Sequence, residues 1–189
     1  MSKAILLSVR PFWAYLIWKL LKTLELRKIV PKFINSLVYI YVTIRPQDLK
    51  KIPEEHREMV KSWMGKVPMR FWFDEYDKLL YVKDRFYKKS YEWSYKQQRQ
   101  SCLTDEEIHL YGEGKDLYAW HIKNLEIFDK PKALREFYTW NESYEQCPFA
   151  MNLAEEYMTT EEILVNRGSK TVTRPTQSYQ YVWVKGERK

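Results

Sequence analysis

The sequence predicts an α+β fold, a small mixed β-barrel with short helices on its rim. Five or six strand-like segments are interleaved with short helical segments, and a strand-like segment stands at each end of the chain. The sequence has no glycine-rich phosphate loop of the G-x-G-x-x-G kind, which argues against a parallel doubly wound sheet. With 189 residues, of which 45% are hydrophobic, the chain fits one domain over residues 1–189.

The first elements are predicted to be a strand, a helix and a second strand. Residues Ala4 to Val9 favour a short strand, and Pro11 suits the first turn of a helix that we expect to run to about Lys22. The spacing i, i+3, i+4, i+7 predicts that its buried stripe consists of Trp13, Leu16, Ile17 and Leu20. From Thr23 onward the hydrophobic period changes to two, as in a strand with one solvated face. Four charged residues gather at this helix-to-strand corner: Lys22, Glu25, Arg27 and Lys28.

The middle of the chain is predicted to carry the central strands. Leu37 to Ile44 is β-branched and aromatic, typical of a strand buried on both sides. Asp48 to Trp63 favours a helix in its second half, with Gly65 placed to end it. Val67 to Val82 alternates and favours a long strand, bent near Asp74 to Asp77.

The second half is predicted to mix helices and strands. The variable aromatic and basic segment at about 83–100 is interpreted as either a helix or a loop, whereas Thr104 heads a capping signal that predicts a helix from Asp105 to Tyr111. Three further elements are expected: a strand over Leu117 to Phe128, a short helix that starts at Pro131 and covers Lys132 to Tyr138, and a final strand over Tyr179 to Val184.

The charge is concentrated at the two ends of the chain. The net charge is +7, and residues 1–50 carry nine Lys or Arg against two Asp or Glu, whereas residues 51–167 carry eighteen against twenty-two. Residues 168–189 carry five against one. If the ends are neighbours in the fold, they form one positive face that favours phosphate-bearing partners. A solvated lysine-rich surface is the alternative.

Several classes of protein are disfavoured. The apolar run from Ile5 to Leu21 is interrupted by Arg10 and Lys19, so we expect no membrane span, and no signal-peptide cleavage site follows it. Cys102 and Cys147 form no pair motif, which favours a reducing, cytoplasmic setting over a disulfide framework. The histidines and cysteines show no metal-ligand spacing, so neither a metal nor a cofactor is expected.

The motif Lys22-x-x-Glu25-x-Arg27 after an aromatic helix resembles the G-x-K-x-x-E-x-R signature of the activating-signal-cointegrator homology (ASCH) domain, a branch of the PUA-like barrels. The segments AILLSVRP, CLTDEEIHLYGEGKDLYAWHIKNLEIFDKPKALREFY and RPTQSYQYV also resemble small ASCH-like proteins common in phages and their bacterial hosts. The chain departs from the family at Leu20, where the motif has glycine, so we expect a longer helix and a less open corner. It departs again at Thr176 to Tyr179, where relatives tend to have Pro-Gln-Ser-Trp.

The resemblance implies a PUA-like barrel whose groove beside the motif contacts RNA or a nucleoside, with Lys22, Glu25 and Arg27 as groove residues. Some relatives are enzymes, including amidohydrolases that act on acetylated cytidine and a few ribonucleases. In the amidohydrolase branch a threonine stands where this chain has Glu25, so the proposed hydroxyl nucleophile is absent.

The geometry of a strand adds detail to these candidates. Glu25 and Arg27 are expected on one strand face, about 7 Å apart, close enough for a lateral salt bridge that Lys22 approaches from the helix end. Such a row is suited to holding a phosphate or reading a base edge. The alternative is an ion pair that seals the end of the barrel. Ser8 and Arg10, just before the helix, are candidates for a second phosphate contact.

Trp120 and His121 form the remaining candidate pair. A tryptophan offers a base a stacking platform, and a neighbouring histidine is able to bond to a base or a phosphate. Adjacent residues of a strand point to opposite faces, so only one of the two is expected to face the groove. A structural role is the alternative for His121.

The sequence therefore predicts an RNA- or nucleotide-binding module with a basic groove and no catalytic residues. One alternative is an amidohydrolase or ribonuclease in which Lys22 and Glu25 are the acid–base pair. A second is a phage protein that binds a host or defence protein and keeps the barrel as a scaffold. The sequence does not predict the oligomeric state.

Overall fold

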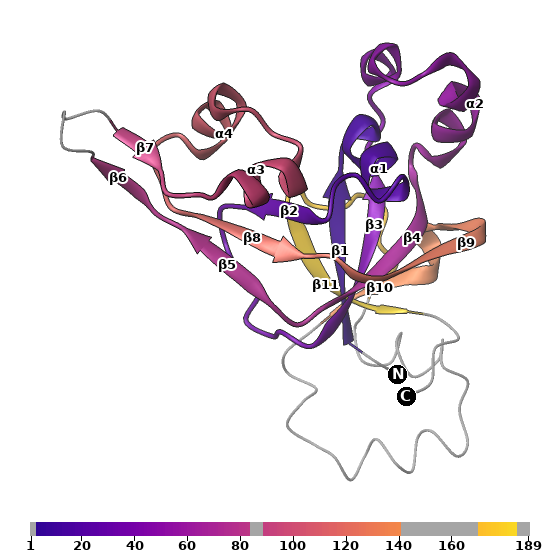
Figure 1. Cartoon of the computed structure of the whole chain (residues 1–189). Helices are drawn as coiled ribbons and strands as arrows, with labels where there is room; N and C mark the ends of the chain where they lie inside the picture. The colour runs from indigo at the N-terminus through magenta and orange to yellow at the C-terminus, as the bar shows by residue number, and fades with distance from the viewer. Residues whose placement is uncertain (1–2, 84–88, 141–169, 185–189) are drawn as a thin grey trace, which may run out of the picture.

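The structure is a computed structural model that describes residues 3–83, 89–140 and 170–184 (Figure 1). The largest sheet has the strand order β10-β11-β1-β3-β4-β9. Its strands are β1 (Lys3–Val9), β3 (Ser36–Val42), β4 (Lys66–Phe73), β9 (Lys123–Ala133), β10 (Phe137–Thr139) and β11 (Tyr179–Val184). Only β1 and β3 run parallel, and every other neighbouring pair is antiparallel. The parallel pair is joined by a crossover that contains the helix and strand of the charged corner.

A smaller antiparallel sheet carries the charged corner. Its order is β2-β8-β5, and a two-stranded ribbon extends beyond it. The bounds are β2 (Leu24–Arg27), β5 (Tyr76–Leu79), β6 (Tyr81–Lys83), β7 (Lys89–Tyr91) and β8 (Leu117–His121). β4 leads into β5 and β8 leads into β9, so two continuous stretches of chain pass from one sheet into the other (Figure 1).

The fold is α+β, as the sequence predicts, but the expected closed barrel is not seen in the described residues. Each sheet there has two edge strands: β10 and β9 in the large sheet, and β2 and β5 in the small one. The strands therefore form open, strongly connected sheets.

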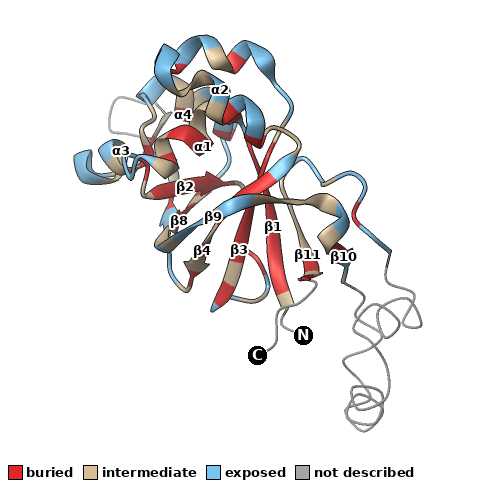
Figure 2. Ribbon diagram, turned by 90° about the vertical axis from the view of Figure 1, so that its right-hand side faces the viewer, coloured by how far each residue is buried: buried red, intermediate tan, exposed pale blue. Residues whose placement is uncertain are grey.

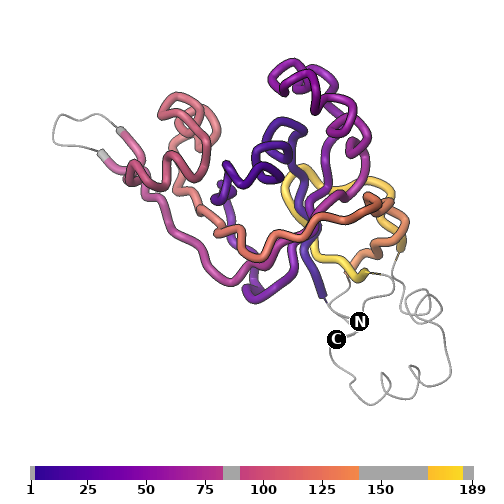
Figure 3. The backbone as a smooth tube through the Cα atoms, turned by 45° about the vertical axis from the view of Figure 1, so that its right-hand side comes forward, coloured from indigo at the N-terminus to yellow at the C-terminus, as the bar shows by residue number. Residues whose placement is uncertain are grey.

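The helices form two groups on the sheets. α1 (Pro11–Trp18), the 3-10 helix η1 (Pro46–Lys51) and α2 (Glu54–Trp63) gather beyond one end of the large sheet, whereas α3 (Tyr95–Ser101) and α4 (Asp105–Gly112) lie over the small sheet (Figures 1 and 3). A second 3-10 turn, η2, covers Leu134–Glu136. Among the described residues, no helix is long and apolar enough to cross a membrane.

Both faces of the large sheet are buried in its centre (Figure 2). β1 shows this most clearly, because Ile5 and Leu7 join the core under α1 and α2 while Ala4 and Leu6 join a second core on the opposite face. A third core lies between the small sheet and α4, and includes Leu24, Leu26, Leu117 and Ile108. The apolar strands at both ends of the chain therefore meet in the interior, as β1 pairs with β11.

Most predicted elements are confirmed. The bent strand over Val67 to Val82 appears as β4, β5 and β6 with breaks between them, and the helix expected over Asp105 to Tyr111 is α4 with the predicted capping box of Thr104 and Glu107. The variable segment contains β7 and α3, and residues 84–88 of it lie outside the described residues, as does Cys147.

The prediction of a helix that starts at Pro131 is wrong. β9 continues through Pro131 to Ala133 because Lys132 and Ala133 pair with β4, where they face Val67 and Lys66. Only the single turn of η2 follows, and its Glu136 carboxylate accepts the amide of Ala133 at 2.7 Å. Pairing between strands thus overrides the local helix signal.

Candidate functional site

The corner between α1 and β2 begins with a tight helix end. The amide of Leu20 donates to the carbonyl of Ile17. The amide of Leu21 donates to the carbonyl of Leu16, and the two bonds together make a Schellman motif. Leu20 adopts the left-handed backbone that this motif needs, with φ 58°. The helix therefore ends before Lys22, which it was expected to reach.

Leu20 does not belong to the buried stripe predicted for α1. Its side chain is 66% exposed, because the helix has already ended. This leucine stands where the ASCH motif has glycine, yet its backbone has a φ that glycine adopts freely. The longer helix expected from this departure is therefore not seen, because the backbone at Leu20 takes the conformation that ends the helix.

Lys22, Glu25 and Arg27 form a continuous row of charges, as the sequence predicts. Glu25 Oε1 lies 2.8 Å from Arg27 Nη2, and Glu25 Oε2 lies 3.4 Å from Lys22 Nζ. The row is buried, with exposed fractions of 3%, 6% and 7% in chain order. The lateral pair is as expected, whereas the burial is deeper than an open groove would give.

Both cations of the row also bond to backbone carbonyls. Lys22 Nζ donates to the carbonyl of Ser101 at 2.7 Å, at the end of α3. Arg27 Nη2 donates to the carbonyl of Ser8 at 2.8 Å, in β1. The ring of Trp13 in α1 lies 5.3 Å from Lys22 Nζ. The row thus ties β2 to three other elements, which agrees with the alternative of a structural seal.

Burial changes the acid–base properties of this corner. Loss of hydration lowers the pKa of Lys22, and the charge of Glu25 opposes this effect. Burial also raises the pKa of the Cys102 thiol, while the Lys22 charge acts in the other direction. Both shifts favour neutral side chains. The charge of Arg27 also lowers the pKa of Lys22, because two cationic groups share one carboxylate here.

The row faces the large sheet. Glu25 lies opposite Trp120 in the pairing of β2 with β8, and Arg27 lies opposite Tyr118. Opposed residues of an antiparallel pair share a sheet face. Trp120 stacks on Phe73 of β4, with ring centres 4.7 Å apart, so this shared face is the one that packs on the large sheet.

Two buried N–H groups on this face have no acceptor within the part of the chain that the structure describes. They are Arg27 Nε and Trp120 Nε1. Leaving a buried donor unpaired costs about 1–3 kcal/mol, so such groups are uncommon in folded proteins. Both donors mark places where an outside acceptor would gain a hydrogen bond.

His121 lies on the other face of β8, away from the row. Its Nε2 lies 3.2 Å from Asp77 Oδ2 on β5, and its amide donates to the carbonyl of Glu75. As predicted, Trp120 and His121 do not share a face. The contacts of His121 fit the structural role that was its alternative.

Ser8 and Arg10 bond to neighbouring parts of the chain. Ser8 Oγ donates to the carbonyl of Thr176 at 2.6 Å. Arg10 makes a two-pronged contact with Asp48, with Nε and Nη2 at 2.9 Å and 2.7 Å from the two carboxylate oxygens. Both side chains therefore already have partners at the positions where a second phosphate contact was expected.

The rim beside Arg27 is formed by the end of α4. Tyr111 is near the Arg27 guanidinium there: burial raises the pKa of Tyr111, and the Arg27 charge acts in the opposite direction. Lys28 Nζ lies 2.7 Å from the Glu113 carboxylate and 5.6 Å from the Tyr111 ring centre. Sequence reasoning missed Tyr111, because only its position at the end of the capped helix could have pointed to it.

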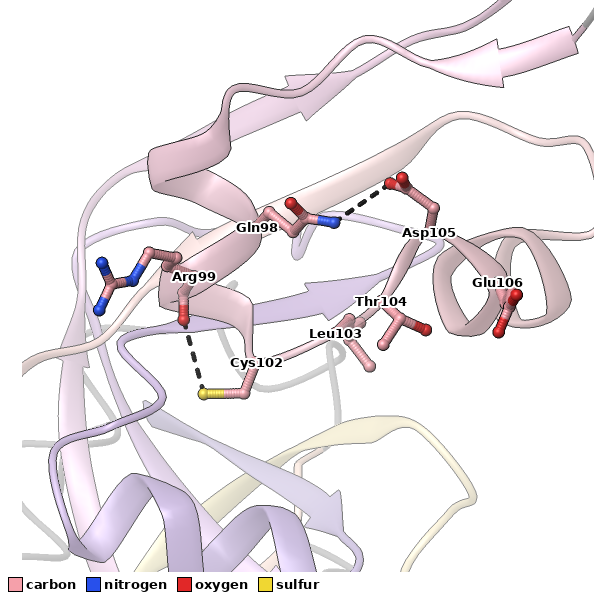
Figure 4. Close-up of a pocket in the computed structure, with 7 residues that line it drawn as sticks. All are labelled: Gln98, Arg99, Cys102, Leu103, Thr104, Asp105 and Glu106. Atoms are coloured by element: carbon pink, nitrogen blue, oxygen red, sulfur yellow. Dashed lines mark hydrogen bonds between the residues drawn. The ribbon is translucent and has the colours of Figure 1, made fainter.

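A surface pocket of about 620 Å³ lies where α3 turns into α4 (Figure 4). Its lining residues are Gln98, Arg99, Cys102, Leu103, Thr104, Asp105 and Glu106. Cys102 Sγ lies 3.2 Å from the carbonyl of Leu21, so the pocket borders the corner that holds the row. In residues 3–83, 89–140 and 170–184 no group of three or more His, Cys, Asp or Glu is placed to hold a metal ion.

The open sheets and the buried row on β2 define an α+β domain with an ASCH-like fold. The solved structures that it resembles include an ASCH protein from Zymomonas mobilis, with a TM-score of 0.52 and 16% identity over 97% of this chain and 88% of that one. Two point-mutant structures of that protein each give a TM-score of 0.51, at 16% and 13% identity, and cover 98% and 97% of this chain and 92% and 89% of theirs.

No protein-family model matches the sequence, and neither does any curated protein. The similarity to the Zymomonas mobilis structures therefore concerns the fold, which is the one that the sequence resemblance predicts.

Proposed function

We propose that this chain binds RNA or a nucleotide, and that the row of Lys22, Glu25 and Arg27 receives a phosphate group or a base edge. The observation that carries this proposal is the imbalance of buried charge, because two cationic groups share one carboxylate. A buried charge that lacks a counter-charge destabilises the fold. A phosphate bound beside the row would balance it.

The unpaired donors support the same site. Arg27 Nε completes the planar fork with which arginine binds phosphate or a base edge through two parallel bonds. Trp120 Nε1 lies on the neighbouring strand and the same face. Trp120 is fully buried against Phe73, so we assign it a donor role and not the stacking role suggested by the sequence.

Access to the row depends on Tyr111. This residue is 37% exposed at the end of α4, and the Arg27 charge opposes the rise in its pKa that burial causes, so we infer that its side chain lies between Arg27 and solvent. Rotation of Tyr111 away from Arg27 would expose the guanidinium without unfolding any strand. We therefore include this movement in the proposed binding step.

The arrangement of the chain ends supports a polyanionic ligand. β1 and β11 pair directly, so one strand from each of the two basic segments lies beside the other. The segment before β11 approaches the row, since Ser8 bonds to Thr176 and accepts a hydrogen bond from Arg27. The exposed positive charge of Lys170 and Arg174 on this segment would raise the local concentration of RNA at this face.

The first test is the salt dependence of RNA binding, measured by fluorescence anisotropy with labelled single-stranded and hairpin RNA. Three phosphate contacts would lower the affinity roughly tenfold or more between 50 and 200 mM salt. Binding that is undetectable, or unaffected by salt, would contradict the proposal. Thermal unfolding under the same conditions checks that the salt leaves the fold intact.

The second test is the substitution Trp120→Phe, which removes one unpaired donor and keeps an aromatic ring. We expect a five- to tenfold loss of RNA affinity, which corresponds to about 1–1.4 kcal/mol for one hydrogen bond. Trp72→Phe, on β4, is the matched control and should bind like the unmodified chain. Equal affinity in both variants would remove Trp120 from the site.

An enzyme is the second candidate, and one observation favours it. The lowered pKa of Lys22 makes its neutral, basic form easier to reach than that of an ordinary lysine, and Glu25 lies 3.4 Å away to exchange a proton with it. These two residues form the acid–base pair of an amidohydrolase or ribonuclease. The reaction would have to proceed without the threonine hydroxyl of the related amidohydrolases.

Turnover separates the two candidates. The purified chain is incubated with acetylated cytidine and, separately, with RNA, and products are measured by chromatography. Loss of turnover in Glu25→Gln with retained RNA binding would support the enzyme. Absence of turnover in the unmodified chain, together with salt-dependent RNA binding, would support the binding module.

A further inference from the structure

Three aromatic rings surround the ammonium group of Lys3. Its Nζ lies 3.2 Å from the ring centre of Phe33, 3.5 Å from that of Trp140 and 4.8 Å from that of Tyr181. The rings stand steeply to one another, with interplanar angles of 72°, 73° and 63°. Their centres are 5.6–6.3 Å apart, so the three rings form the walls of one box.

The walls of this box are held by bonds that do not involve Lys3. The amide of Phe33, in the connection between β2 and β3, donates to the Tyr181 hydroxyl at 3.3 Å. The amide of Trp140, just after β10, donates to the carbonyl of Tyr181 at 3.3 Å. All three rings are half-buried, so the box is partly open to solvent. We therefore expect it to persist when Lys3 leaves it.

We propose that Phe33, Trp140 and Tyr181 form a binding site for a trimethylammonium group, and that Lys3 occupies this site as a tethered competitor. Ring faces attract a cation through their quadrupole, which requires no N–H group on the cation. A methylated ammonium is weakly hydrated, and its methyl groups keep its nitrogen farther from the ring faces than the 3.2 and 3.5 Å at which Lys3 Nζ lies, so it would sit nearer the solvent side of the box. The site is independent of the row around Glu25 and does not rest on the proposed RNA binding.

The direct test is Lys3→Met, which removes the charge and keeps an unbranched stem. Choline is titrated into the full chain and into this variant, and binding is measured by calorimetry. We expect the variant to bind choline about tenfold or more tightly than the unmodified chain, because the competitor is gone. Adding Phe33→Leu to Lys3→Met should abolish the gain.

Two further probes define the ligand chemistry. The neutral tert-butyl analogue of choline should bind at least tenfold more weakly than choline to Lys3→Met, because it lacks the charge. Nα-acetyl-trimethyllysine amide tests whether a side chain of a peptide is accepted as well as a free metabolite. Equal binding of choline and its neutral analogue, or equal binding by Lys3→Met and its Phe33→Leu derivative, would overturn the proposal.

A measurement on the unmodified chain tests the proposal even if the variants do not fold. Acetic anhydride labels exposed lysines, and mass spectrometry gives the rate at Lys3. High choline should displace Lys3 and raise its labelling rate several-fold, whereas the rate at Lys50 on η1 should stay constant. An unchanged rate at Lys3 would show that choline does not compete for the box and would overturn the proposal.

Discussion

Leu20 adopts a left-handed backbone conformation that glycine usually provides. The Schellman motif at the end of α1 demands a left-handed residue, and the leucine adopts φ 58° to provide it. For a residue with a Cβ this conformation costs roughly 1–2 kcal/mol, whereas glycine adopts it freely. The chain therefore carries local strain beside the row.

Replacing this leucine by glycine should stabilise the protein. Leu20→Gly removes the left-handed penalty and disturbs little packing, since the side chain is 66% exposed. We expect the free energy of unfolding to rise by about 0.5–1 kcal/mol after the greater flexibility of unfolded glycine is counted. Urea denaturation measures it. Leu21→Gly is the matched control, because Leu21 is also exposed but is not left-handed, and it should destabilise or leave stability unchanged.

Lys22 should make stability depend on pH in the alkaline range. Its pKa is lowered in the folded chain, so between that value and the ordinary lysine pKa the unfolded state binds more protons than the folded state. The free energy of unfolding therefore rises with pH across this window, by about 1.4 kcal/mol for each pKa unit between the two states.

The substitution Lys22→Met isolates this effect. Relative to Lys22→Met, the unmodified chain should gain stability as pH rises through the window, and urea denaturation at a series of pH values measures the difference. Lys50→Met, at an exposed position of η1, should follow the unmodified chain at every pH. Parallel curves for the unmodified chain and Lys22→Met would show that Lys22 titrates alike in the folded and unfolded states.

The geometry of the row could be predicted from the sequence, but its burial could not. Alternation along a strand places Glu25 and Arg27 on one face whatever they pack against, and that part is confirmed. The carbonyls that receive Lys22 and Arg27 belong to Ser101 and Ser8, which no local pattern links to β2. Contacts between segments that are far apart in the sequence decide burial, and a single sequence does not reveal which segments these are.

Elements with strong local signals were predicted well. α4 has a capping box at Thr104 and acidic residues in its first turn, and it forms where expected. The helix predicted after Pro131 does not form, because β9 pairs with β4 through these residues and this pairing outweighs the local helix signal. The same pairing makes β9 an edge strand of the large sheet.

The packing of α4 against β7 depends on Gly112. A Cβ at this position would overlap the hydroxyl of Tyr91 and press on Leu117, so Gly112→Ala must displace the tyrosine. Tyr91 then loses its bond to the carbonyl of Lys115, which measures 2.8 Å. We expect a loss of about 1–3 kcal/mol in the free energy of unfolding.

Thermal or urea denaturation measures the effect of Gly112→Ala. Leu110→Ala, on the same helix and 81% exposed, is the control and should change stability little. A Gly112→Ala variant as stable as the unmodified chain would mean that Tyr91 moves aside without penalty, and that α4 is held by its other contacts with the third core.

At the scale of the whole molecule, the fold shows where the basic segments of the sequence lie. β1 and β11 are neighbours, so one strand from each of the two basic segments of the sequence lies beside the other. The segment that leads into β11 carries Lys170 and Arg174, both exposed, and continues to Thr176, which bonds to Ser8 beside Arg27. Exposed positive charge therefore leads toward the buried row.

The charges on this segment should contribute to RNA affinity without contributing to the fold. In Lys170→Glu with Arg174→Glu, both changes lie on exposed side chains, so we expect an unchanged unfolding midpoint. RNA affinity should fall several-fold at low salt, and the slope of log affinity against log salt should decrease by about one for each phosphate that the variant no longer binds. The matched control is Lys50→Glu with Lys51→Glu on η1, which contacts α1 and α2. If the segment before β11 takes part in binding, Lys170→Glu with Arg174→Glu must lose RNA affinity, and Lys50→Glu with Lys51→Glu must keep it. Equal losses would instead indicate that RNA responds only to net charge, and the face beside the row would then have no special part in binding.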